Sequence, residues 1–116
     1  NPPVLKRFWG QMKEVMVKPS RLDPLTKELI YLAVSINNNC DYCINSHTFA
    51  ARKQGLDDEM LAELTEVIAL ANAGNRLTIG LQVEPDERFK PKRPAEPWSA
   101  GKTARAKPAK DRKKVR

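Results

Sequence analysis

The sequence predicts an all-α protein. Its apolar side chains recur at steps of three and four residues, which is the period of an amphipathic helix. No segment sustains the alternation of a half-buried strand, and proline, glycine and aspartate stand where helices are expected to begin and end. We therefore expect about five helices in a small domain over residues 1–89, followed by a basic extension over residues 90–116.

The first two helices are expected at residues 4–17 and 24–36. The first carries an apolar stripe at three-and-four spacing. Asp23 is a good N-cap for the second, and Pro24 would occupy the first helical position, where its missing N–H costs nothing. The second helix is apolar on almost every side, so we expect it to lie in the core and at a subunit contact. Glu28 stands out there, because a carboxylate among apolar residues is costly unless it is paired or hydrogen-bonded.

Three further helices complete the expected domain. The third begins at Cys40 or Asp41 and stops at Gly55, a natural C-cap. Acidic residues 57–59 open the fourth helix, where they suit the positive end of its dipole. A kink or a break is expected around residues 73–75, and residues 76–81 are expected to form a short last helix.

Size and composition suggest an oligomer in the cytoplasm. The chain has no apolar run of 18 or more residues and no basic-then-apolar start, so we expect neither a membrane segment nor a signal peptide. A domain of short helices with about ninety residues buries only a modest core by itself. Association of several copies would bury the remaining apolar surface.

The basic charge belongs to the C-terminal segment. Eleven of the 21 lysines and arginines lie in residues 90–116, which carry a net charge of +9, whereas residues 1–89 carry −2. Such a composition is typical of disorder. Within residues 90–116 only Trp98 has an aromatic ring on which a base could stack. We therefore favour a solubilising or subunit-clasping role for this segment over nucleic-acid binding.

Residues 40–47 gather both cysteines and the only histidine of the chain. Steps of three and then four residues put Cys40, Cys43 and His47 on one helical face. Cys40 is better placed to feel the helix dipole, and Cys43 is better placed to exchange a proton with His47, so the order of attack stays open. Two adjacent thiols favour redox chemistry that ends in an internal disulfide over Cys–His hydrolysis, which needs one thiol.

Other interpretations compete with this one. Cys-x-x-Cys is half of many zinc sites, but a closed site would need Glu28, Asp41, a water or another subunit as its fourth ligand. His47 alone can be a histidine at the edge of the core. Glu28 alone can be a carboxylate paired with Lys27 or with another helix. We expect neither a metal nor a bound cofactor.

These residues carry a resemblance to a known family. The stretch from Glu28 to His47 resembles the alkylhydroperoxidase D-like branch of the carboxymuconolactone decarboxylase family. The redox signature of that branch is a glutamate, a Cys-x-x-Cys pair twelve residues later, and a histidine four residues after the second cysteine. Glu28, Cys40, Cys43 and His47 match all three spacings. The likeness covers about residues 20–85, and its combined motif is far more specific than Cys-x-x-Cys alone.

The resemblance implies a fold, an assembly and a role for each residue. It implies a helical subunit that forms a homotrimer or a homohexamer. In the family's peroxidases the second cysteine attacks the peroxide and the first resolves it. Carried over, Cys43 is peroxidatic, Cys40 is resolving, His47 is the base near Cys43, and Glu28 is the relay carboxylate. The chain departs from this pattern at Tyr42, where well-characterised relatives have a second histidine, so the relay is simpler and turnover is expected to be weaker.

The leading hypothesis is therefore a thiol–disulfide oxidoreductase with alkyl-hydroperoxide-type peroxidase activity. Its substrate would be a small peroxide or disulfide, and an external dithiol would reduce it again. Relatives without the cysteine pair include lactone decarboxylases, which form the first alternative. A zinc-stabilised or basic-tailed interaction module is the second.

Overall fold

The computed structural model describes residues 1–90. The chain divides into two units, Asn1–Val83 and Glu84–Arg116. The described part of the second unit holds one 3₁₀ turn, Glu87–Phe89. The basic segment expected at residues 90–116, including Trp98, lies outside the described residues apart from Lys90.

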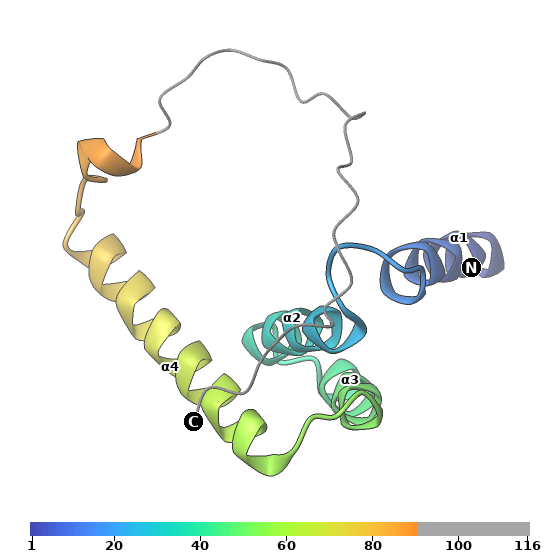
Figure 1. The fold of residues 1–116 in the computed structure, drawn as a ribbon. Coiled ribbons are helices and arrows are strands. Elements are labelled where there is room, and N and C mark those ends of the chain that lie inside the picture. The colour runs from blue at the N-terminus through green and yellow to red at the C-terminus, as the bar shows by residue number, and fades with distance from the viewer. Residues whose placement is uncertain (91–116) are drawn as a thin grey trace. The chain divides into compact units, whose positions relative to one another are not determined.

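The first unit is entirely helical (Figure 1). Its α-helices are α1 (Pro2–Met12), α2 (Pro24–Asn37), α3 (Asp41–Lys53) and α4 (Asp58–Gly80). A π-helical segment, η1 (Lys13–Val17), continues α1. Residues 1–90 contain no strand, which confirms the predicted fold class. Over the same residues no helix is long and apolar enough to cross a membrane.

The beginning of α2 follows the sequence prediction. Asp23 is the N-cap, and its carboxylate accepts hydrogen bonds from the backbone N–H of Thr26 at 2.9 Å and from its hydroxyl at 2.7 Å. Pro24 is the first helical residue. The bonds from Thr26 lower the pKa of Asp23 below its ordinary value. The cap therefore contributes stability at neutral pH, and that contribution is lost as the pH falls through the lowered pKa.

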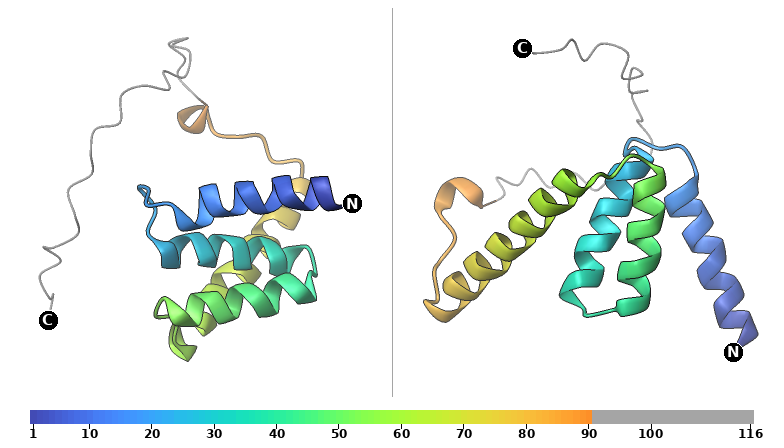
Figure 2. Two further views of the ribbon diagram at one scale, coloured as in Figure 1. Left: turned by 90° about the vertical axis from the view of Figure 1, so that its right-hand side faces the viewer. Right: turned by 90° about the horizontal axis from the view of Figure 1, so that it is seen from below.

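The hairpin of α2 and α3 positions the cysteine pair. The two helices run antiparallel and side by side (Figure 2). The turn between them uses Asn39 in the left-handed region at φ 53°, a conformation that asparagine tolerates better than most residues. The backbone N–H of Cys40 then donates to the carbonyl of Ser35 at 3.0 Å, which returns the chain to the end of α2. Cys40 thereby becomes the N-cap of α3.

The core is small and centred on this hairpin. Leu32 of α2 is fully buried, and Ala51 and Leu56 are buried beside it. Partly buried side chains from α2, α3 and the first turns of α4 pack around them: Leu25, Leu29, Ile36, Ile44, Met60, Leu61 and Leu64. Within this one chain α2 is not covered on every side as expected, because Ile30 and Val34 stay about half exposed.

The C-terminal helix differs from the prediction. No break occurs around residues 73–75, and the short helix expected at 76–81 is the last part of α4. A glycine inside a helix costs only about 1 kcal/mol relative to alanine, and the neighbouring alanines favour the helix. The hydroxyl of Thr78 also donates to the carbonyl of Gly74 at 3.1 Å, within the helix. The unit consequently has four α-helices where five were expected.

Replacing Leu32 by alanine should lower the free energy of unfolding by about 2–5 kcal/mol, since the side chain is fully buried at the centre of the core. Leu32→Met conserves the volume and should cost less than about 1.5 kcal/mol. Urea denaturation followed by circular dichroism measures both. Equal losses in the two variants would contradict this description of the core.

Candidate active site

The cysteine pair occupies the first turn of α3. Cys40 and Cys43 form a disulfide, with Cα atoms 5.2 Å apart. The Cys40 sulfur also accepts the backbone N–H of Cys43 at 3.4 Å, which gives the helix a sulfur cap. Both sulfurs therefore lie at the positive end of the α3 dipole, a position that favours a thiolate when the pair is reduced.

Glu28 and His47 form the second part of the site. The carboxylate oxygen Oε2 of Glu28 on α2 lies 2.6 Å from Nδ1 of His47 on α3. The two side chains are only 15% and 12% exposed, so water screens this contact weakly. The alternative pairing of Glu28 with Lys27 does not occur, since the nearby helix supplies the histidine instead. The histidine thus gives the Glu28 carboxylate the hydrogen-bond partner that a polar group needs in apolar surroundings.

The Glu28 contact orients the imidazole. An ionised carboxylate can only accept a hydrogen bond, so Nδ1 of His47 is the donor in this contact whenever Glu28 is ionised. In the neutral ring Nε2 then carries the lone pair and is the nitrogen that can take up a proton. His47 follows Cys43 by four residues on α3, which is one helical turn.

Tyr31 belongs to the site although it was not among the residues predicted for it. Its ring stacks on His47, with centroids 3.6 Å apart and planes inclined by 20°. Tyr31 follows Glu28 by three residues on α2, and this spacing was the one signal that placed both residues on the same face. The imidazole of His47 is held by Glu28 at its edge and by Tyr31 at its face.

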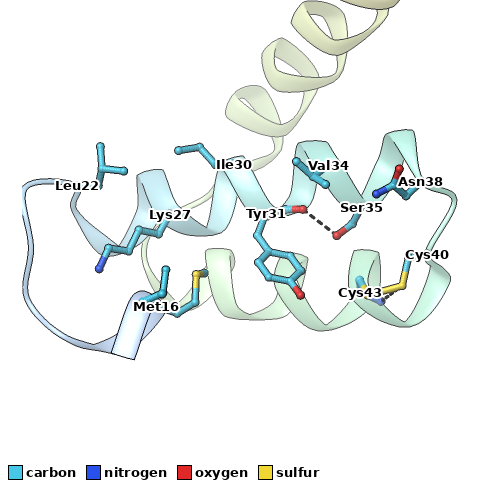
Figure 3. A pocket seen from close by; sticks show the side chains of 11 residues that line it. Met16, Leu22, Lys27, Ile30, Tyr31, Val34, Ser35, Asn38, Cys40 and Cys43 are labelled. Atoms are coloured by element: carbon cyan, nitrogen blue, oxygen red, sulfur yellow. Dashed lines mark hydrogen bonds between the residues drawn. A yellow bond between two sulfur atoms is a disulfide. The ribbon is translucent and has the colours of Figure 1, made fainter. Parts of the chain in front are cut away.

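An apolar pocket of about 480 Å³ lies beside the disulfide (Figure 3). Its size is typical of small-molecule sites. Cys40 and Cys43 stand at one end of the lining and Lys27 at the other (Figure 3). The lining residues are Val15, Met16, Leu22, Lys27, Ile30, Tyr31, Val34, Ser35, Asn38, Cys40 and Cys43.

The predicted site residues are thus placed in two groups. Cys40 and Cys43 line the pocket, whereas Glu28 and His47 are not part of its lining. Tyr31 joins the groups, because it lines the pocket and stacks on His47. Tyr42 is not part of the pocket lining, and the residue is 79% exposed.

The competing interpretation of the cysteine pair as half of a zinc site can be compared with the described residues. In residues 1–90 no three or more histidine, cysteine, aspartate or glutamate side chains are grouped so that they could hold a metal ion. The zinc-stabilised alternative therefore lacks a ligand set in this part of the chain.

Comparison with known proteins identifies a relative of similar fold. In its fold the chain is similar to the crystal structure of the alkylhydroperoxidase AhpD core from Rhodospirillum rubrum, with a TM-score of 0.73 and 49% sequence identity. That similarity covers 77% of this chain and 65% of the other.

A second relative is an uncharacterized protein, protein 4 in the cox locus of Paracoccus denitrificans. It is 35% identical over 63 residues, which are 54% of this chain and 57% of that protein. The chain thus spans less than two thirds of the length of either relative. The model of the carboxymuconolactone decarboxylase family matches residues 3–83, which cover the helices of the first unit except for Pro2, the first residue of α1. The chain belongs to the carboxymuconolactone decarboxylase family, in its AhpD-like branch.

Proposed function

We propose that this protein is a thiol–disulfide oxidoreductase that reduces organic hydroperoxides. The observation that carries the proposal is a Cys-x-x-Cys disulfide at a helix N-terminus, in the wall of an apolar pocket. Such a pocket suits the organic group of an alkyl hydroperoxide better than it suits hydrogen peroxide, which has no apolar surface to bury. The 49% identity to a protein named as an alkylhydroperoxidase core supports the same reaction class.

Cys43 is the proposed peroxidatic residue. Its thiolate attacks the terminal oxygen of the hydroperoxide, the O–O bond breaks, and the alkoxide leaves and takes a proton to become an alcohol. The sulfur is oxidised by two electrons to a sulfenic acid while the peroxide is reduced. Cys40, three residues away, is within disulfide reach of this sulfur.

Cys40 is the proposed resolving residue. Its thiolate attacks the sulfenic sulfur of Cys43, a disulfide forms, and hydroxide leaves and takes a proton to become water. The disulfide is then opened by thiol–disulfide exchange with an external dithiol, which is itself oxidised to a disulfide. We place this cycle in the cytoplasm, where thiols are kept reduced.

Glu28 and His47 are the proposed proton relay. Nε2 of His47 takes the thiol proton of Cys43 and returns a proton to the leaving oxygen, and Glu28 keeps the ring in the required tautomer. Tyr42 is a supporting residue. Its phenol can donate a hydrogen bond but exchanges protons poorly near neutral pH, so the relay works with one imidazole.

We also propose that the chain acts as a homotrimer or a homohexamer. Large apolar side chains are exposed along α1 and α4: Val4, Leu5, Phe8 and Trp9 on the first, and Val67, Leu70, Leu77 and Ile79 on the second. Contiguous exposed apolar surface of this kind is typical of subunit contacts. Association would complete the burial that the small core of one chain leaves unfinished.

Treating the reduced protein with one equivalent of cumene hydroperoxide should consume both thiols and release one equivalent of alcohol, because each turnover ends in the Cys40–Cys43 disulfide. Stopped-flow thiol counting and mass spectrometry measure the stoichiometry. Cys43→Ser should abolish the reaction. Its matched partner Cys40→Ser should still react once and stop at a sulfenic acid that dimedone traps.

Peroxide consumption at the wild-type rate by Cys43→Ser would overturn the proposed mechanism. Full lactone decarboxylation by the double Cys→Ser variant would instead assign this chain to the decarboxylase activity of its family.

His47 should be found as the Nδ1–H tautomer when neutral, because Glu28 accepts a hydrogen bond from that nitrogen. It is the only histidine of the chain, so a long-range ¹H–¹⁵N spectrum contains a single imidazole. Glu28→Gln should give a mixture of tautomers, since an amide both donates and accepts.

His47→Asn should slow peroxide reduction by about 100-fold or more if the imidazole is the general base. In the tautomer measurement, a neutral His47 that carries its hydrogen on Nε2 in the wild-type protein would contradict the proposed relay.

In solution the full chain should have about three or six times the mass of the 13.1 kDa monomer, because its exposed apolar helices favour association. Size-exclusion chromatography with light scattering measures this mass. Leu70→Glu places a charge on the exposed apolar face of α4 and should shift the protein towards smaller species. A 13.1 kDa wild-type species at micromolar concentration would refute the assembly.

A further inference from the structure

Lys27 is an unusual member of the pocket lining. Its residue is only 8% exposed, although lysine is among the residues least often buried. It lines the same apolar pocket as Cys40 and Cys43. The remaining lining contains no other charged residue.

The charge of Lys27 is only partly compensated by the protein. Its Nζ atom donates to the backbone carbonyl of Lys18 at 2.9 Å. Within residues 1–90 no carboxylate forms an ion pair with it. An ammonium group has three donors, and a buried charge is stable only when it is paired or well hydrogen-bonded. An anion in the pocket would supply the missing partner.

The positions of Lys27 and the cysteines define the length of such an anion. Lys27 and Ser35 are separated by eight residues of α2, which corresponds to about 12 Å along a helix axis. Ser35 in turn accepts the N–H of Cys40 through its carbonyl. The ammonium and the sulfurs stand at opposite ends of the lining, with Ile30, Tyr31 and Val34 between them (Figure 3).

We propose that the pocket binds an amphiphilic carboxylate, with the carboxylate on Lys27 and an apolar chain reaching towards the cysteine pair. Resting on the proposed function, this names the substrate class: a hydroperoxide that carries a carboxylate at the far end of an alkyl chain. Lys27 takes no part in the redox step. It binds the end of the substrate that does not react, and the apolar lining directs the peroxide to Cys43.

The binding test uses the oxidised 116-residue chain with octanoate and its neutral counterpart octan-1-ol as probes. Isothermal titration calorimetry should show octanoate bound about tenfold or more tightly than the alcohol, as expected for a charge-assisted hydrogen bond. Lys27→Met should lose this preference and still bind the alcohol. Lys53→Met removes the same charge outside the pocket lining and should keep the preference.

Equal affinities of the wild-type protein for the two probes, or no binding of either, would overturn the proposed anion site. The wild-type comparison decides this even if Lys27→Met fails to fold. Retained preference in a folded Lys27→Met would overturn it as well.

A rate measurement separates this inference from the proposed function. The reduced protein is given a carboxylate-bearing alkyl hydroperoxide and its methyl ester, and kcat/KM should favour the acid in the wild type but not in Lys27→Met. Turnover without discrimination refutes the anion site and leaves the peroxidase. Octanoate preference without any turnover refutes the peroxidase and leaves the anion site.

Discussion

The contact between Glu28 and His47 ties the chemistry of this protein to its fold. The two residues lie on different helices of the α2–α3 hairpin, so their 2.6 Å contact exists only when those helices pack correctly around Leu32. A carboxylate at this position of α2 would otherwise destabilise the core. The same packing sets the imidazole one turn beyond Cys43 and holds it against Tyr31. Correct folding of the hairpin and formation of the Glu28–His47 contact are therefore one event.

The lining of the pocket has different chemistry at its two ends. Its walls come from η1, α2 and the start of α3, and they are apolar between a cation at one end and two sulfurs at the other. An apolar wall contributes affinity without direction, whereas a single buried charge fixes orientation. A site built in this way distinguishes the two ends of a substrate. The helices α1 and α4 contribute no residue to the pocket lining. Their exposed apolar side chains are therefore free for the proposed subunit contacts.

The sequence predicted the helices wherever local chemistry determines them. The Asp23 cap and Pro24 located the start of α2, and the spacing of Cys40, Cys43 and His47 placed the motif on one helix. Glu28 was identified by its odd surroundings and by the family resemblance. The positions of Tyr31 and Lys27 in the site were not predicted. They depend on which elements pack against α2, and hydrophobic periodicity carries no such information. The unbroken α4 was mispredicted because one glycine was given more weight than the helix formers around it.

The position of the disulfide has a consequence for the stability of the oxidised and reduced forms. The cross-link joins residues three apart, and the chain entropy removed by a cross-link grows with the length of the loop it closes. Such a short loop restrains the unfolded chain only slightly. The bond also lies outside the core around Leu32, at the first turn of α3. Opening and closing it should thus shift the folding equilibrium by less than a cross-link that closes a long loop, so the redox cycle proposed above is compatible with a chain that stays folded.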